Sequence, residues 1–263
     1  KKIFKDNNYP IIVDEEGGRV SRLGKIIDNS MFSARYFGDL YLKDKKKFNF
    51  YISMYINKIS YILNMLGINI NTAPVLDLYR KNSNKIIGDR SFSSQPKIVN
   101  KIGDIVIKKF KKNKIFTVIK HMPGHGLATV DSHKKLPIIN KNLKYLKKKD
   151  FIPFKNKNSL FGMTAHILFS KLDRTHCVTH SKNLIRIIRS EIGFKNIIIT
   201  DDISMKALKY DISENTKRAF TSGCNIVLHC NGNLREMTKV AINSDFVSDF
   251  IIKKTSHLVR KLS

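Results

Sequence analysis

Six short apolar runs divide the chain, and each of them ends at a polar or charged residue. The runs cover residues 10–13, 70–76, 116–119, 160–165, 197–200 and 226–228. The residues that directly follow them are Asp14, Asp77, Lys120, His166, Asp201 and His229. Short runs rich in β-branched residues are typical of buried strands. The pattern therefore predicts six strands, each with a polar side chain at its carboxyl end.

Between these runs, apolar residues recur with helical spacing over residues 48–66, 97–110, 181–192 and 213–223. Ser181 and Ser213 stand where the last two of these helices would begin, and serine is a favoured N-cap residue. Strands that alternate with helices form βα units around a parallel sheet. We therefore predict a single α/β domain over residues 1–263, with the polar strand ends gathered at one edge of its sheet.

The formal charge of +28 at pH 7 comes from 49 Lys and Arg against 21 Asp and Glu, and it has two interpretations. A strongly basic chain can bind nucleic acid or another polyanion. Alternatively, the charge is spread over the surface of a chain that is generally rich in Lys, Ile and Asn. The 38 Lys and only 11 Arg favour this second interpretation, because arginine is the preferred residue for phosphates and bases. The chain also lacks a glycine-rich phosphate loop after a predicted strand, which argues against nucleotide binding.

Three cysteines, Cys177, Cys224 and Cys230, are too few for a disulfide framework and indicate a reducing compartment. Cys224 and Cys230 flank one predicted strand together with His229, where we expect two buried thiols rather than a zinc site. His166 ends another strand, as either a sugar contact or a satisfied core histidine. No apolar run approaches the roughly 18 residues that a membrane span needs.

The densest polar segment covers residues 120–133 and holds three of the eight histidines. Asp131 and His133 are two residues apart, so the carboxylate can orient the imidazole for proton transfer to or from a substrate. The competing interpretation is a metal site, whose ligands would be His121, His125, His133 and either Asp14 or Asp201.

Two further segments offer groups for catalysis and for sugar binding. Asp201 and Asp202 follow a buried strand, where one carboxylate can face a site while the other caps a helix. Residues 13–22 bring acids, glycines and two arginines into one compact turn, and Arg90 stands in the loop 87–92. Carboxylates accept paired hydrogen bonds and arginines donate them, which suits sugar hydroxyl groups.

Four segments taken together resemble the N-terminal barrel of glycoside hydrolase family 3, in particular its bacterial β-N-acetylhexosaminidases. They are VDEEGGRVSR (13–22), APVLDLYRKNSNKIIGDRSF (73–92), KHMPGHGLATVDSHKKLP (120–137) and IIRSEIGFKNIIITDDISM (187–205). The resemblance covers roughly residues 10–230 and implies a TIM-type (β/α)8 barrel. Family members have two βα units before the first of these segments, and they are not found here. We therefore expect either a trimmed sequence or an open, divergent barrel that lacks its first two βα units.

The resemblance also implies roles for individual residues. Asp201 corresponds to the family nucleophile, which forms a covalent glycosyl-enzyme. His133 corresponds to the general acid/base, and Asp131 corresponds to its partner in a catalytic dyad. The residues that correspond to those holding the N-acetylglucosamine ring are Asp14, Arg22, Arg90, Lys120 and His121.

The implied activity is that of a retaining exo-β-N-acetylglucosaminidase, which removes terminal β-linked N-acetylglucosamine from muropeptides during peptidoglycan recycling in the cytoplasm. No metal or organic cofactor is implied, no nucleic-acid or membrane partner is expected, and a monomer is expected. A histidine acid/base departs from the usual pair of carboxylic acids. Because histidine does not repel an incoming anion as a carboxylate does, a phosphorylase of the same family stays open. A β-glucosidase also stays open and, in a different class, so does a non-catalytic basic protein that binds nucleic acid.

Overall fold

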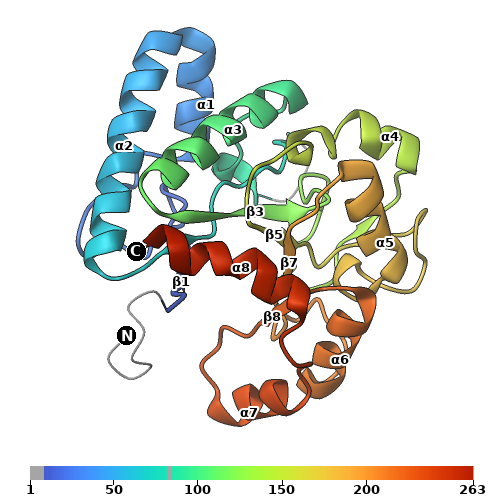
Figure 1. The fold of residues 1–263 in the computed structure, drawn as a ribbon. Coiled ribbons are helices and arrows are strands. Elements are labelled where there is room, and N and C mark those ends of the chain that lie inside the picture. The colour runs from blue at the N-terminus through green and yellow to red at the C-terminus, as the bar shows by residue number, and fades with distance from the viewer. Residues whose placement is uncertain (1–8, 82–84, 263) are drawn as a thin grey trace.

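The computed structural model describes residues 9–81 and 85–262, and six parallel strands form its central sheet (Figure 1). The strands are β1 (Ile12–Val13), β2 (Ile70–Asn71), β3 (Phe116–Met122), β5 (Phe161–Thr164), β7 (Ile197–Asp202) and β8 (Ile226–Leu228). They lie side by side in chain order, and every neighbouring pair is parallel. All six predicted strands are confirmed. A separate parallel pair, β4 (Ile138–Ile139) with β6 (Leu168–Phe169), was not predicted.

Helices alternate with the strands, and most of them lie against the outer face of the sheet (Figure 1). They are α1 (Ala34–Lys43), α2 (Lys45–Met65), α3 (Pro96–Lys112), α4 (Leu143–Lys148), α5 (Lys182–Ile187), α6 (Ile212–Ser222), α7 (Leu234–Ile242) and α8 (Asp249–Leu262). Because a parallel sheet needs a crossover between successive strands, this alternation of strand and helix is what the sequence pattern predicts.

Two helix caps were predicted from the sequence, and their outcomes differ. Ser181 caps α5 as predicted, since its hydroxyl accepts the Leu184 N–H. The predicted cap Ser213 is wrong, because Asp211 caps α6 and Ser213 lies inside the first turn. The Asp211 carboxylate accepts the backbone N–H groups of both Ser213 and Glu214. A carboxylate also favours a helix N-terminus through the helix dipole, which explains why the helix begins at the acid.

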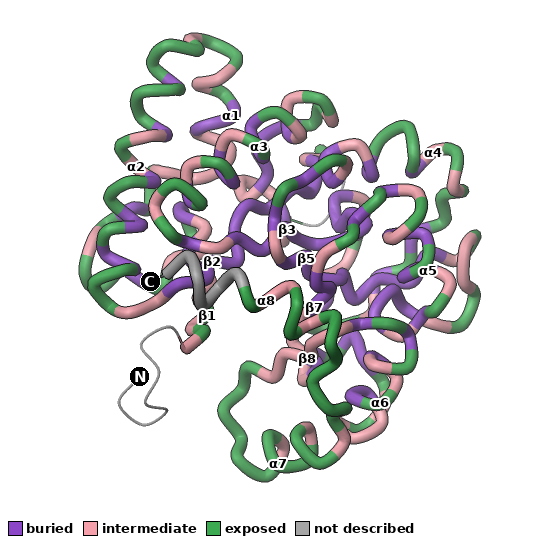
Figure 2. Tube along the Cα trace, viewed as in Figure 1, coloured by how far each residue is buried: buried purple, intermediate pink, exposed green. Residues whose placement is uncertain are grey.

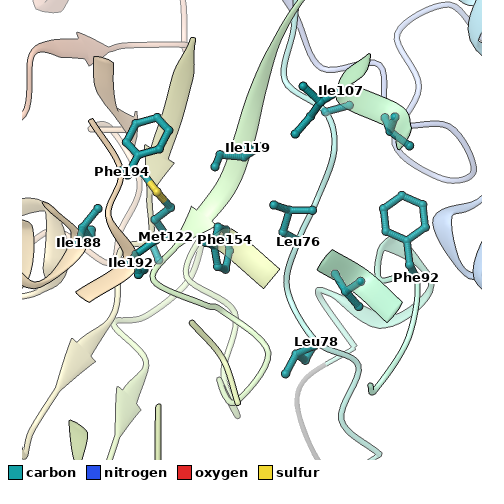
Figure 3. Close-up of a cluster of buried hydrophobic side chains, with 14 of the residues drawn as sticks. Leu76, Leu78, Phe92, Ile107, Ile119, Met122, Phe154, Ile188, Ile192 and Phe194 are labelled. Atoms are coloured by element: carbon teal, nitrogen blue, oxygen red, sulfur yellow. The ribbon is translucent and has the colours of Figure 1, made fainter. Parts of the chain in front are cut away.

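The two faces of the sheet bury different apolar clusters, because successive residues of a strand point to opposite sides. Ile119 of β3 belongs to a large outer cluster between the sheet and the helices, where Leu76 and Phe154 lie nearby (Figure 3). Its neighbour Val118 belongs to a smaller cluster on the inner face with Ile199 of β7. The central strands are accordingly the most deeply buried part of the chain (Figure 2).

The described residues form a curled, half-barrel sheet rather than a closed eight-stranded barrel. The sheet has two edges, β1 and β8, and both are incompletely covered: Ile12 is 40% exposed and every residue of β8 is partly exposed. Helix α8 lies near the inner side, where Ile251 packs against the inner cluster. None of the described helices is long and apolar enough to cross a membrane. The α/β class with its parallel sheet is confirmed, whereas the closed barrel is not seen in these residues.

Helix α1 packs directly on the short 3-10 helix Gly88–Arg90 that carries Arg90, and Gly38 makes this approach possible. A Cβ atom at Gly38 would lie 1.7 Å from the carbonyl oxygen of Phe92, which is a backbone atom with little room to move. The absence of a side chain at this position therefore sets where the Arg90 segment lies relative to the rest of the fold.

We predict that Gly38→Ala lowers the free energy of unfolding by about 1–3 kcal/mol, the usual cost of forcing extra volume into a packed interior. This cost exceeds the helix propensity that alanine gains, which is at most about 1 kcal/mol. Gly24→Ala is the matched control, since a Cβ atom there meets nothing within 4 Å. Its change should stay within about 0.5 kcal/mol. Urea denaturation of both variants tests this, and equal losses would contradict the proposed clash.

Candidate active site

A pocket of about 510 Å³ lies at the carboxyl ends of the strands. Its polar lining comes from segments that follow different strands, as expected for parallel strands whose carboxyl ends share one edge. The predicted site residues that line it are Asp14, Arg22, Arg90, Lys120, His121, His133 and Asp201. Asp131 is in contact with His133 but is not itself part of the pocket wall. The structure thus brings together the side chains that the sequence marked as separate segments.

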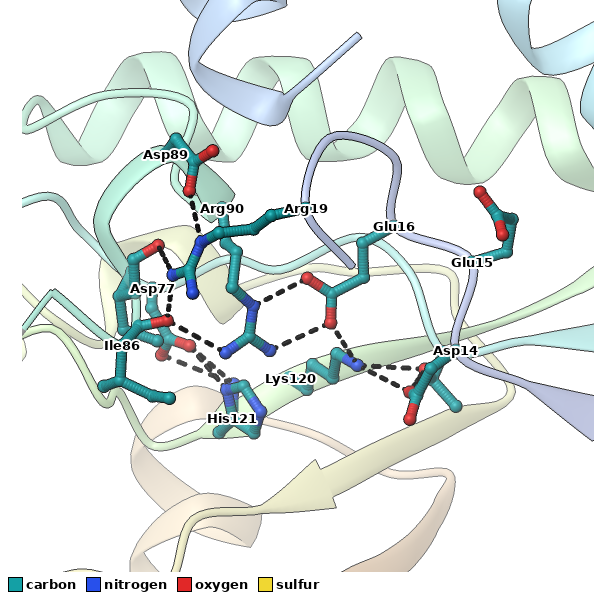
Figure 4. A network of polar contacts seen from close by, with 12 residues as sticks. Asp14, Glu15, Glu16, Arg19, Asp77, Ile86, Asp89, Arg90, Lys120 and His121 are labelled. Carbon is teal, nitrogen blue, oxygen red and sulfur yellow. Dashed lines mark hydrogen bonds and ion pairs between the residues drawn. The ribbon is translucent and has the colours of Figure 1, made fainter. Parts of the chain in front are cut away.

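Lys120 lies at the centre of this site with only 3% of its side chain exposed (Figure 4). Its Nζ is 2.9 Å from Asp14 Oδ1, 2.6 Å from Glu16 Oε1 and 2.9 Å from Thr72 Oγ1. Burial by itself would lower the pKa of Lys120, but Glu16 and Asp14 raise the pKa above its ordinary value. The ammonium group stays charged, and its three N–H donors are matched by these three oxygens.

Arg90 forms a two-point fork with the carboxylate of Glu16. Arg90 Nε is 2.7 Å from Glu16 Oε2, and Nη2 is 2.9 Å from Oε1. Both side chains are at most 10% exposed. Burial would raise the pKa of Glu16, but Lys120 and Arg90 lower it to about 2. Glu16 is therefore an ionised carboxylate held between two cations, and this geometry is the strong form of an arginine–carboxylate contact.

The three consecutive acids of the first turn have different partners (Figure 4). Asp14 and Glu16 face Lys120, whereas Glu15 points away from it. The Glu15 carboxylate accepts the Arg22 and Leu23 backbone N–H groups, and it closes the turn. Arg22 itself is 61% exposed, with its Nη2 3.9 Å from Asp14 Oδ2. The Arg22 guanidinium thus retains free donors at the pocket mouth.

Asp77 is fully buried beneath the pocket and orients His121. Its Oδ2 is 2.6 Å from His121 Nδ1, and its carboxylate also accepts the backbone N–H groups of His121 and His125. Burial would raise the pKa of Asp77, but His121 and His125 and these hydrogen bonds lower it. The ionised Asp77 accepts a hydrogen bond from the Nδ1–H group of His121. The Nε2 of His121 is therefore left for a ligand in the pocket.

Asp201 and Asp202 have different surroundings, as the sequence allowed: one carboxylate faces the site and the other holds a turn. Asp202 accepts the Ser204 and Cys230 backbone N–H groups at 3.0 Å and 3.1 Å and so holds the turn after β7. Asp201 Oδ1 accepts only the N–H of Asp202 among its described hydrogen-bond donors, at 2.9 Å. Burial would raise the pKa of Asp201, but His121, His166 and Lys120 contribute to lowering it below the ordinary value. Asp201 is an ionised carboxylate available to the pocket.

His166 is a satisfied core histidine rather than a sugar contact. It is 0% exposed, and its Nδ1 is 2.7 Å from Thr179 Oγ1 while its Nε2 is 3.0 Å from the carbonyl oxygen of Asp202. The imidazole therefore supports the backbone under the two aspartates. Burial lowers its pKa, which keeps the ring neutral near neutral pH.

His133 lies on the pocket wall and forms the predicted pair with Asp131, which lies behind it. His133 Nδ1 is 2.9 Å from Asp131 Oδ1, and the same oxygen accepts the His133 backbone N–H at 2.9 Å. The His133 side chain is 63% exposed. Burial would raise the pKa of Asp131, but its hydrogen bonds to His133 lower it. The carboxylate is thus ionised and fixes the ring orientation, whereas His133 Nε2 makes no hydrogen bond within the described residues.

Two residues that build the site, Glu16 and Asp77, were not among the predicted site residues. Both lie in segments that carry the family resemblance, and Asp77 directly follows an apolar run as Lys120 and Asp201 do. Its position after an apolar run could have identified Asp77 as a site residue from the sequence. Nothing local distinguishes Glu16 from Glu15, because their roles are set by Lys120 and Arg90 on distant segments.

The predictions for metal ligands and thiols have different outcomes. Among the side chains that the structure describes, in residues 9–81 and 85–256, no three His, Cys, Asp or Glu are grouped in a way that could hold a metal ion. The expectation of two buried thiols is correct for Cys224 and wrong for Cys230, which is exposed. Cys230 follows the edge strand β8 at the pocket rim, where no further strand of the described residues covers it.

We predict that Glu16→Ala lowers the free energy of unfolding by about 3–5 kcal/mol, because it leaves two buried cations without their shared partner. Asp89→Ala is the matched control, since Asp89 pairs with Arg19 at 2.7 Å but both side chains are more than 40% exposed. Loss of an exposed pair should cost less than about 1 kcal/mol. Urea denaturation at pH 7 measures both, and similar losses would contradict the buried network.

The same carboxylate predicts how stability depends on pH. Because folding lowers the pKa of Glu16 from 4.5 to about 2, its contribution is complete above about pH 4.5 and is lost as the pH falls towards 2. Glu16→Gln removes this titration. The free energy of unfolding should therefore fall less steeply for Glu16→Gln than for the unaltered protein over this pH range. Urea denaturation at about pH 4.5, 3.5 and 2.5 measures the free energy of unfolding of both proteins. The same dependence on pH in both would contradict the assignment.

Comparison with known proteins places this geometry in a family. Residues 8–260 match the family model described as the glycosyl hydrolase family 3 N terminal domain. Beta-hexosaminidase A of Pseudoalteromonas piscicida is 32% identical over 236 residues, which cover 83% of this chain and 39% of that protein. A beta-hexosaminidase of Nitrosomonas eutropha is 32% identical over 231 residues, covering 84% of this chain and 64% of that protein. The chain therefore spans less than two thirds of the length of these two relatives.

Solved structures show the same architecture. NagZ from Neisseria gonorrhoeae, in complex with N-trifluoroacetyl-D-glucosamine, has a TM-score of 0.83 and 28% identity, covering 95% of this chain and 73% of that one. A family 3 β-N-acetylglucosaminidase from Paenibacillus has a TM-score of 0.80 and 27% identity, covering 96% of this chain and 49% of that one. With a family model that matches nearly the whole chain, this protein belongs to the glycosyl hydrolase family 3 N-terminal domain family.

Proposed function

We propose that this domain catalyses the hydrolysis of terminal β-linked N-acetylglucosamine with retention of configuration. The observation that carries the proposal is an ionised Asp201 in the same pocket as the Asp131-oriented imidazole of His133. A retaining glycosidase needs a carboxylate nucleophile and a proton donor for the leaving group. The names of the similar proteins, beta-hexosaminidase and β-N-acetylglucosaminidase, support the choice of sugar.

In the first step, an Asp201 carboxylate oxygen attacks the anomeric carbon and the bond from that carbon to the leaving oxygen breaks. His133 transfers its Nε2 proton to the leaving oxygen, so the alcohol departs neutral. The product of this step is a covalent glycosyl-Asp201 ester. Asp131 stabilises the imidazolium form of His133 from which the proton is donated, because its carboxylate accepts a hydrogen bond from the Nδ1–H group.

In the second step, water attacks the anomeric carbon from the side that the leaving group vacated, and the ester bond to Asp201 breaks. His133, now neutral, takes the proton from the attacking water. Two displacements at one carbon restore the original β configuration. His133 therefore replaces the second carboxylic acid that retaining enzymes usually employ.

The remaining polar groups suit recognition of a single sugar ring. The Asp14 side chain is 41% exposed, and its Oδ1 is paired with Lys120 Nζ. The rest of the carboxylate can therefore accept hydrogen bonds from sugar hydroxyls. Arg22 and His121 Nε2 offer further contacts from the rim and the floor. Lys120 has its donors matched inside the protein, and we assign it the role of positioning Asp14.

We further propose that the natural substrates are muropeptides released during peptidoglycan recycling in the cytoplasm. Muropeptides carry peptide carboxylates, and the formal charge of +28 attracts anions over a distance set by ionic strength. The three cysteines are free, which fits a reducing compartment. A polyanion partner is not needed to explain the charge.

The test is hydrolysis of an aryl N-acetyl-β-glucosaminide by the purified protein. We predict that Asp201→Asn lowers kcat/KM by at least about 10³-fold, because it removes the attacking oxygen anion. A 5-fluoro-N-acetylglucosaminyl fluoride should add one sugar mass to the peptide containing Asp201 in the unaltered protein only. Asp28→Asn is the control, since Asp28 is exposed on a turn outside the pocket and its loss should leave activity unchanged.

Several outcomes would overturn the proposal. No hydrolysis by the unaltered protein, or full activity in a folded Asp201→Asn variant, would exclude the mechanism. A higher kcat/KM on the aryl glucoside than on the N-acetylglucosaminide would support a β-glucosidase instead. Appearance of a sugar phosphate in phosphate buffer, absent in a non-phosphate buffer, would show that the enzyme is a phosphorylase.

A further inference from the structure

Ser132 lies between the two residues of the proposed dyad, but it is more deeply buried than either of them. Ser132 is 3% exposed, whereas the side chains of Asp131 and His133 are 23% and 63% exposed. The loop therefore inserts its middle residue into the protein and presents its flanking residues outward. A buried hydroxyl needs a hydrogen-bond partner, and here the partner is an imidazole.

The Ser132 hydroxyl meets the buried ring of His125. Ser132 Oγ is 3.2 Å from His125 Nε2, and His125 is 3% exposed. The backbone N–H of His125 donates to Asp77 Oδ1 at 2.6 Å, and its ring packs edge-on against His121 with 5.5 Å between ring centroids. Burial, the largest effect, and His121 lower the pKa of His125 to about 4, so the ring is neutral near neutral pH.

The backbone on both sides of His125 packs closely against other segments of the protein. A Cβ atom at Gly126 would lie 2.2 Å from the carbonyl oxygen of Leu78. At Gly124, which has a φ of +138°, a Cβ atom would lie 3.0 Å from the Cβ of Asp150. Glycine suits both positions, because Gly126 packs against a backbone oxygen and Gly124 has a positive φ. His125 therefore belongs to the body of the domain rather than to the loop.

Hydrogen bonds inside the loop do not tie it to this body. The backbone N–H groups of Lys134 and Lys135 both donate to the carbonyl oxygen of Asp131, and the His133 N–H donates to the Asp131 carboxylate. Within the part of the chain that the structure describes, only the hydrogen bond between Ser132 and His125 joins segment 131–135 to the rest of the domain.

We propose that the Ser132–His125 hydrogen bond is a latch that docks the Asp131–His133 pair over the pocket. This inference rests on the proposed function for its catalytic consequence, but not for the docking itself. Ser132 is a positioning residue: it does not touch the reacting atoms and acts through His133. Without the latch, the loop spends part of its time undocked, and the leaving group then lacks its proton donor.

The test compares substrates that differ in their need for a proton. A 2,4-dinitrophenyl leaving group departs as a stable anion, whereas a phenyl leaving group requires protonation. We predict that Ser132→Ala lowers kcat/KM about tenfold on phenyl N-acetyl-β-glucosaminide, the effect of losing one good hydrogen bond. On the dinitrophenyl substrate, kcat/KM should change less than about twofold, and the inhibition constant of N-acetylglucosamine should stay unchanged. Lys135→Ala, an exposed change in the same loop, is the control and should alter neither substrate.

A second readout does not depend on catalysis. In Ser132→Ala, hydrogen–deuterium exchange of the peptide that spans residues 127–137 should accelerate severalfold, while exchange in β3 and β7 stays unchanged. His125→Phe keeps a ring but removes the nitrogen that hydrogen-bonds with Ser132, so it should give the same two effects. Combining it with Ser132→Ala should add little, because both remove one hydrogen bond.

The outcomes separate the latch from the proposed function. Equal loss on both substrates, no loss on the phenyl substrate, or unchanged loop exchange would each overturn the latch. If the unaltered protein hydrolyses neither substrate, the proposed function fails, and the exchange measurement alone decides whether Ser132 docks the loop.

Discussion

The buried ammonium group of Lys120 is the interaction on which the rest of the pocket depends. It stands on β3, and its oxygen partners belong to the turn after β1 and to the segment after β2. Removing an ammonium ion from water costs several kcal/mol unless opposite charges and hydrogen bonds replace the solvent. The three strand ends must therefore meet at one point, and a shift of any of them would remove a hydrogen-bond or charge partner of the buried ammonium group.

Charge balance inside this network contrasts with the composition of the whole chain. Lys120 and Arg90 face Asp14 and Glu16, two cations against two anions, although the chain as a whole carries a formal charge of +28. Low dielectric makes unbalanced charge costly in the interior but tolerable at the surface. The excess of lysine is therefore a surface property, whereas inside the network Arg90 acts as a fork to the single carboxylate of Glu16.

Histidines complete the site in distinct ways. His121 is oriented by a buried carboxylate beneath it, and His166 supports the backbone under Asp201 and Asp202. His133 is exposed and paired with Asp131 on a loop. His125 is buried away from solvent, and its ring meets the loop instead. These histidines differ in burial and in the partner of each ring nitrogen, and we propose a different role for each on that basis.

The sequence pattern predicted those features whose physical cause lies within a few neighbouring residues. The six strands follow from short apolar runs, and Ser181 caps its helix because capping involves only the next few residues. The cap of α6 was misjudged by two residues, since Asp211 and Ser213 are both good caps and only the path of the chain chooses between them. Burial of Cys230 was misjudged because it depends on whether another strand covers β8.

By itself, the sequence determined the alternation of strands and helices and the polar residue at each strand end, because periodicity and turn chemistry act over neighbouring positions. Only the tertiary structure decided which polar groups meet. Asp14 and Lys120 are 106 residues apart in the chain yet 2.9 Å apart in space. Glu15 and Glu16 are adjacent and chemically alike, but one closes a turn and the other joins two buried cations. Their difference arises from the parallel sheet, which brings distant strand ends to one edge.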